Sequence, residues 1–197
     1  LHQMSDPRRD LVEHLDQLRT RKSDYEIACL LEANRRAAFG HFALAEAFRS
    51  GEASELDLHL LFLRATQQDD PETPYKNIVA LGANAATLHH VSYRKQPARG
   101  VASQSMLVDA GATCFGYCSD ITRTYVKGSG AAASAFAELL SLTEAFQQRL
   151  CARVRVGDKY EALHEEAHRE VAAALRSIGL TQLSVDEAVS AKLTRSF

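Results

Sequence analysis

The sequence predicts an α+β fold built around an antiparallel sheet, and three observations lead to this class. The first third of the chain has the periodicity and capping signals of helices, the middle third has short apolar runs typical of strands, and the last third returns to helical patterns. Helices and strands in separate runs are typical of α+β folds, whereas α/β folds alternate them. The 197 residues suffice for one domain, or for one domain with an appendage.

Composition excludes several classes of function. Apolar residues make up 46% and charged residues 24% of the chain, as in ordinary globular proteins. The net charge is -2 and no basic stripe is interleaved with aromatic residues, so neither a nucleic acid nor an anionic membrane is an expected partner. No apolar run reaches membrane-spanning length and no signal peptide is visible, so we expect a cytoplasmic protein.

Three helices are predicted in the first third. Residues 5–19 begin with a capping residue followed by proline, which suits a first helical turn. Residues 23–51 open with serine and have glutamate three positions later, which is the spacing of a capping box, and end at glycine. Residues 54–66 repeat this opening with serine and aspartate.

Strands are predicted in the middle third and helices in the last. The strand candidates are "NIVALG" at 77–82, "TLHHVSY" at 87–93, and two runs within 105–126. Helical patterns cover residues 132–154 and 158–179, separated by a glycine, and a short helix is expected within 183–197.

Two aspartates inside the apolar runs of 105–126 suggest a functional site. A hairpin turn near Thr113 to Gly116 would place Asp109 and Asp120 opposite each other, with Cβ atoms about 4.5–5.5 Å apart. Like charges at this spacing need a shared proton, a cationic side chain or metal ions, and carboxylates so placed suit divalent cations. The alternative is that an aspartate near a turn only caps that turn.

Two longer segments carry a family resemblance. "PYKNIVALGANAATLHH" at 74–90 and "LVDAGATCFGYCSDITRTY" at 107–125 resemble the Xaa-Pro dipeptidases (prolidases) of the pita-bread metallopeptidase family. The resemblance implies the N-terminal half of a pita-bread fold, an antiparallel sheet with helices packed on its outer face. It also implies a division into a linking helix from a missing N-terminal domain, at 1–22, and an incomplete catalytic domain at 23–197.

The same resemblance implies roles for four residues. In the family the first aspartate binds one metal ion and the second bridges two, which carries over to Asp109 and Asp120. His89 matches a histidine beside the substrate carbonyl or the leaving nitrogen, and Tyr75 matches a tyrosine that lines the pocket. The implied cofactors are two divalent metal ions, usually manganese. The implied substrate is a dipeptide with proline second, and the complete protein would be a homodimer.

The resemblance also leaves ligands to be found. The family takes one histidine and two glutamates from a later segment, expected beyond Phe197, so we expect the chain to be incomplete and inactive alone. The alternative within the same fold is a pita-bread module that binds peptides without catalysis.

A competing motif, "HEEAH" at 164–168, fits the zinc-protease pattern H-E-x-x-H. His164 and His168 are four residues apart, so they share one face of a predicted helix. No histidine or cysteine follows them, and Glu170 and Glu187 remain possible third ligands. The alternative is an amphipathic helix flank with half-exposed histidines.

Overall fold

The computed structural model describes residues 7–97 and 103–195 of the chain, which form two compact units. The first unit contains residues 7–97 together with 107–123, and the second contains 103–106 together with 124–195. Each unit is described by itself below.

Three helices begin the first unit, and their ends follow the capping signals. They are α1 (Pro7–Thr20), α2 (Asp24–Ser50) and α3 (Glu55–Thr66). Ser23 before α2 and Ser54 before α3 both complete a capping box with the carboxylate three residues later. The three predicted helices are therefore confirmed.

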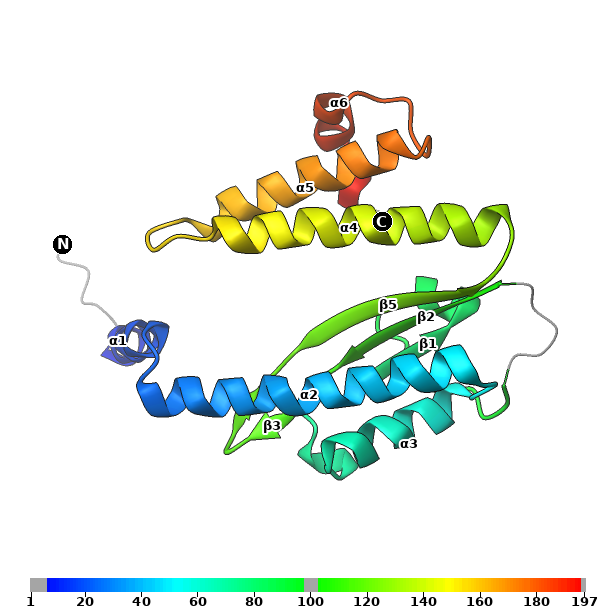
Figure 1. Ribbon diagram of the computed structural model, residues 1–197. Coiled ribbons are helices and arrows are strands. Elements are labelled where there is room, and N and C mark those ends of the chain that lie inside the picture. Colours follow the sequence, from blue (N-terminus) through cyan, green and yellow to red (C-terminus); the bar gives the residue numbers. More distant parts are fainter. Residues whose placement is uncertain (1–6, 98–102, 196–197) are drawn as a thin grey trace. The chain divides into compact units, whose positions relative to one another are not determined.

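Helices α2 and α3 lie side by side and supply much of the core of this unit (Figure 1). Phe62 of α3 is fully buried, and its ring lies where a Cβ atom on Gly40 of α2 would be. A larger residue at Gly40 would therefore push the two helices apart. Leu44 and Leu58, at most 1% exposed, continue the same interface.

A three-stranded sheet has the order β1-β2-β5. Its strands are β1 (Ile78–Leu81), β2 (Ser103–Ala110) and β5 (Ile121–Gly128). All four residues of β1 are buried, and β1 packs on α3. The predicted α+β class, with antiparallel strands and helices packed on the sheet, is confirmed.

A short antiparallel ribbon connects β2 to β5. Strands β3 (Thr113–Cys114) and β4 (Tyr117–Cys118) pair across a two-residue turn formed by Phe115 and Gly116. Both turn residues have positive φ, 49° and 81°, as a tight hairpin of this length requires. The predicted turn near Thr113 to Gly116 is confirmed, and α2 packs against both ribbon strands.

The strand predicted at 87–93 is wrong. After β1 the chain forms a 3-10 helix, η2 (Gly82–Ala86), and then runs without regular structure to residue 97. The backbone of this loop is held by side chains instead of by a ladder: the Tyr93 ring stacks on His59 at 4.4 Å, and the Tyr93 hydroxyl donates to the Asn77 carbonyl. The apolar residues Leu88 and Val91, which suggested a strand, are exposed in this loop.

The second unit is helical after β5. Its elements are α4 (Ala131–Arg153), α5 (Tyr160–Ser177), α6 (Val185–Ser190) and the 3-10 helix η3 (Leu193–Arg195). Helix α5 packs between α4 and α6 (Figure 1), and Arg149 of α4 pairs with Glu170 of α5 at 2.7 Å. The helices predicted in the last third are confirmed. Among the described helices, none combines the length and apolarity that crossing a membrane would need.

Candidate functional site

The Tyr75 hydroxyl brings two aspartates together. Tyr75 follows the 3-10 helix η1 (Asp70–Glu72), and its oxygen lies 2.7 Å from Asp109 Oδ1 and 2.8 Å from Asp120 Oδ1. A phenol carries one proton, so it can donate to only one carboxylate at a time. The other carboxylate then faces a lone pair, and the cluster is electrostatically incomplete without a further proton or a cation.

The phenol of Tyr75 remains a donor. Burial of the ring raises the pKa of Tyr75 far above its ordinary value, and the hydrogen bonds to the two aspartates and their negative charges raise it further. The hydroxyl therefore stays protonated near neutral pH. Within the described part of the chain, neither Asp109 nor Asp120 forms an ion pair with a basic side chain.

Strand β2 sets the position and direction of Asp109. The neighbouring residues Val108 and Ala110 are fully buried, so strand alternation turns Asp109 to the opposite, half-buried face. The Ala110 carbonyl accepts a hydrogen bond from Nε2 of the buried His41, at 3.2 Å. Burial lowers the pKa of His41, so this ring is the neutral donor that fixes the end of β2.

Asp120 is held in place by a close approach of two parts of the chain, at Gly111 and Ser119. The Ser119 hydroxyl accepts from the Ala112 amide at 2.9 Å and also lies 3.2 Å from the Ala33 carbonyl of α2. A Cβ atom on Gly111 would collide with the Ser119 carbonyl and would lie 2.8 Å from a ring carbon of Pro74. Gly111, two residues after Asp109, is therefore required for Asp120 to lie close to Asp109.

The predicted residues differ in where the structure places them. Asp109, Asp120 and Tyr75 meet through hydrogen bonds, although the sequence did not predict the contact between the tyrosine and the aspartates. His89 is exposed in a turn after η2, with a left-handed φ of 56°. In residues 7–97 and 103–195, no hydrogen bond or ion pair joins His89 to the other three.

Sequence reasoning missed the residue that organises the loop carrying His89. Glu55, at the start of α3, is 0% exposed, and both its carboxylate oxygens are used. Oε1 accepts from the Leu81 amide and the Asn84 side chain, each at 2.8 Å. Oε2 accepts from the Arg94 amide at 2.7 Å and from His90 Nε2 at 3.1 Å. One carboxylate therefore fixes both ends of the segment 81–94.

The surroundings of Glu55 favour its ionised form. Burial acts to raise the pKa of this carboxyl, but the hydrogen bonds from Arg94, Leu81, Asn84 and His90 together outweigh it and lower the pKa below its ordinary value of 4.5. In the sequence Glu55 had no signal beyond its place in the first turn of a helix, where acidic residues are common.

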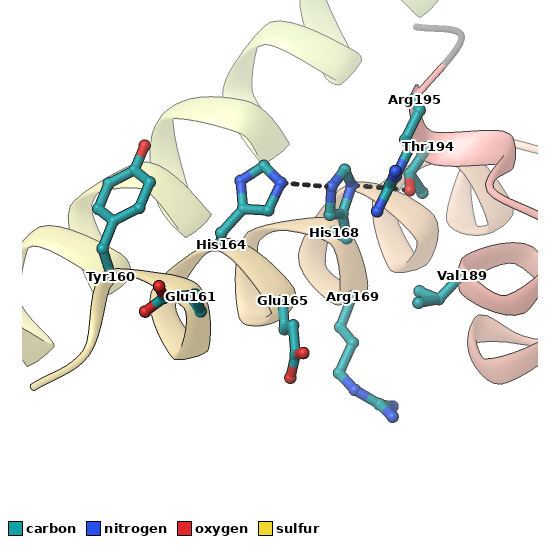
Figure 2. A pocket seen from close by; sticks show the side chains of 9 residues that line it. All are labelled: Tyr160, Glu161, His164, Glu165, His168, Arg169, Val189, Thr194 and Arg195. Atoms are coloured by element: carbon teal, nitrogen blue, oxygen red, sulfur yellow. Dashed lines mark hydrogen bonds between the residues drawn. The ribbon is translucent and has the colours of Figure 1, made fainter. Parts of the chain in front are cut away.

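The "HEEAH" histidines lie together on α5 (Figure 2). His164 Nε2 and His168 Nε2 are 3.0 Å apart, and His168 Nδ1 lies 2.8 Å from the Thr194 hydroxyl of η3. The two candidate third ligands are engaged elsewhere, because Glu170 pairs with Arg149 and Glu187 caps α6 through Ser184. Among the described residues, no group of three or more histidine, cysteine or acidic side chains could hold a metal ion.

Comparison with known proteins places the chain in a family. Residues 28–191 match metallopeptidase family M24. The Xaa-Pro dipeptidase of Marinobacter nauticus is 42% identical over 188 residues, which cover 95% of this chain and 42% of that protein. The Xaa-Pro dipeptidase of Pseudoalteromonas atlantica is 37% identical over 187 residues, again 95% of this chain and 42% of that protein. The chain therefore spans about two fifths of the length of these curated relatives.

Comparison with solved structures agrees with this family assignment. Escherichia coli aminopeptidase P with the inhibitor Pro-Leu matches 89% of this chain and 39% of its own, with a TM-score of 0.77 and 26% identity. Proline aminopeptidase P II from Yersinia pestis matches the same shares with a TM-score of 0.77 and 25% identity. The resemblance to pita-bread metallopeptidases is thereby confirmed. This chain belongs to metallopeptidase family M24.

Proposed function

We propose that this chain contributes the first part of an active site that hydrolyses dipeptides with proline in the second position. The observation that carries the proposal is the convergence of Asp109 and Asp120 on the single hydroxyl of Tyr75. Two carboxylates held this close repel each other, and a purely structural role does not explain why the fold brings them together. They lie in a segment that matches a metallopeptidase family. The Xaa-Pro dipeptidases among the relatives supply the substrate class.

The donor set fits divalent cations. Both aspartates offer only oxygen ligands, which suit hard ions such as Mn²⁺ or Mg²⁺ better than soft ones. The cluster also lacks a basic partner among the described residues, so a cation would balance its charge. We infer that Asp109 and Asp120 hold two divalent ions, most simply manganese, with further ligands from outside this chain.

Each residue then has a defined task. When bound, divalent ions act as Lewis acids and lower the pKa of water. Asp109 and Asp120 hold and orient them, while the Tyr75 hydroxyl fixes the rotamers of both carboxylates through one hydrogen bond at a time. His89 donates a hydrogen bond to the substrate carbonyl or the leaving nitrogen, for which its exposed position leaves it free.

Other properties of the whole protein follow the same proposal. With 42% of a relative's length, the chain would depend on a later segment for its remaining metal ligands, so we expect no dipeptidase activity from these residues alone. We propose that residues 1–22 are a linking helix and 23–197 part of the catalytic domain. We also propose that the complete protein is a homodimer in the cytoplasm.

A chimera tests the proposal directly. The matching segment of the Marinobacter nauticus Xaa-Pro dipeptidase is replaced by this chain, and proline release from Ala-Pro is measured with Mn²⁺. Asp120→Ala should lower turnover by at least about 100-fold, because a bridging ligand is lost. Asp16→Ala, at an exposed position of α1, is the matched control and should change nothing.

The other readings give different results in the same assay. A non-catalytic binding module predicts a folded chimera that binds Ala-Pro but releases no proline. A zinc protease predicts that His164→Ala abolishes hydrolysis, whereas the proposed site predicts that it leaves turnover unchanged. Full activity of the Asp120→Ala chimera would refute the proposal.

A further inference from the structure

We propose that His164 and His168 form a second cation site, distinct from the aspartate cluster, that binds an imidazole-preferring transition-metal ion such as Ni²⁺ or Zn²⁺. The site lies wholly within the second unit of the chain and plays no part in the proposed peptidase chemistry. It is a binding site and not a catalytic one.

The geometry of the two rings carries the inference. Histidines four residues apart share one helix face, and here Nε2 of His164 and Nε2 of His168 are 3.0 Å apart. Two nitrogens bound tetrahedrally to one ion at 2.0–2.1 Å lie about 3.3 Å apart. The N···N distance is therefore within a few tenths of an ångström of the value for two ligands of one ion, and a rotation of the rings would aim both lone pairs at it. The ring planes now meet at 80°, in a T-shaped arrangement (Figure 2).

Thr194 supplies the outer contact that histidine ligands usually have. Its hydroxyl oxygen lies 2.8 Å from His168 Nδ1, on the side of the ring away from His164 (Figure 2). When Nδ1–H donates to this oxygen, the lone pair of Nε2 faces His164, which is the tautomer a metal ligand needs. Thr194 is 6% exposed, so this contact fixes the ring orientation.

The site is accessible, and charged side chains of both signs line it. His164 is exposed and His168 half-buried, in an open groove that Glu161, Glu165, Arg169 and Arg195 also line. Arg169 is occupied by Asp186 at 2.7 Å, so its guanidinium is already neutralised. Glu165 points away from the two rings (Figure 2), and water would complete the coordination sphere.

Ligand chemistry separates this site from the aspartate cluster. Imidazole nitrogens suit Ni²⁺, Zn²⁺ and Cu²⁺, whereas the oxygen-only pair of Asp109 and Asp120 suits Mn²⁺. With two protein ligands, the ion would be held less tightly than in a structural zinc site, where four are usual. The alternative is a single N–H···N hydrogen bond between the rings with no affinity for metal.

Calorimetric titration of NiCl₂ into the untagged chain tests the inference. We expect one Ni²⁺ site that His164→Ala weakens by at least about tenfold, and that Thr194→Val weakens by about tenfold. His14→Ala removes an exposed histidine of α1 and should leave the affinity unchanged. Because His164 is exposed, its replacement should preserve the fold, which far-UV circular dichroism checks. As a second variant, His168→Gln should weaken Ni²⁺ binding similarly.

The result separates this site from the proposed peptidase site. Asp109→Asn changes the aspartate cluster and should leave Ni²⁺ binding intact. Absence of Ni²⁺ binding, or equal affinity in His164→Ala and the unaltered chain, would overturn the inference. Neither result would bear on the aspartate cluster.

Discussion

Replacement of Glu55 by alanine should strongly lower the free energy of unfolding of the chain. The carboxylate is fully buried and accepts four hydrogen bonds, two of them from the backbone amides of Leu81 and Arg94. Alanine removes both acceptor oxygens and with them all four hydrogen bonds. The donors of Leu81, Asn84, His90 and Arg94 would then lose their partners together.

The size of the effect follows from these contacts. An unsatisfied buried donor costs about 1–3 kcal/mol, and four partly buried donors at the low end give about 4 kcal/mol. Removal of one member of a buried charged network costs about 3–5 kcal/mol, which agrees. Glu55→Gln retains one acceptor oxygen and turns an NH₂ group towards the other donors, so we expect about half this loss.

Urea denaturation of the isolated chain measures the effect. Glu55→Ala should lower the free energy of unfolding by about 4 kcal/mol, and amide hydrogen exchange at Leu81 and Arg94 should lose its protection. Glu46→Ala removes an exposed carboxylate from α2 and should change stability by less than about 0.5 kcal/mol. A loss below about 1 kcal/mol for Glu55→Ala would show that Glu55 does not organise the loop.

Three further predictions concern Tyr75, Gly111 and the ionisation of Glu55. Tyr75→Phe removes the donor that Asp109 and Asp120 share, so the metal-free chain should lose about 1–2 kcal/mol in urea denaturation; an unchanged midpoint would contradict the shared hydrogen bond. Gly111→Ala forces a Cβ atom into the Ser119 carbonyl and should cost about 3 kcal/mol or more in urea denaturation; unchanged stability would mean that this contact is loose. The pKa of Glu55 is lowered by folding, so its contribution to stability is complete above its unfolded value of 4.5 and is lost as the pH falls through the folded value. Below pH 4.5, urea midpoints of the unaltered chain should therefore fall more steeply with decreasing pH than those of Glu55→Gln, and parallel slopes would refute the assignment.

Several elements could be predicted from local signals in the sequence. The capping boxes at Ser23 and Ser54 fixed the starts of α2 and α3, because serine and an acid three residues later satisfy each other without distant help. The turn at Phe115 and Gly116 likewise follows from the conformational freedom of glycine in a tight hairpin. The period of two along a strand was enough to predict that Asp109 and Asp120 would come together.

How distant parts of the chain hold these elements in place depends on the tertiary structure. The segment 87–93 was predicted as a strand, yet it lies in a loop that Glu55 of α3 holds through the amides of Leu81 and Arg94 and the side chain of His90. The same holds for Tyr75, whose hydroxyl reaches Asp109 and Asp120 from a different loop. Hydrogen bonds of this kind leave no periodic trace in the sequence, because they depend on which groups the folded core brings within 3 Å of each other.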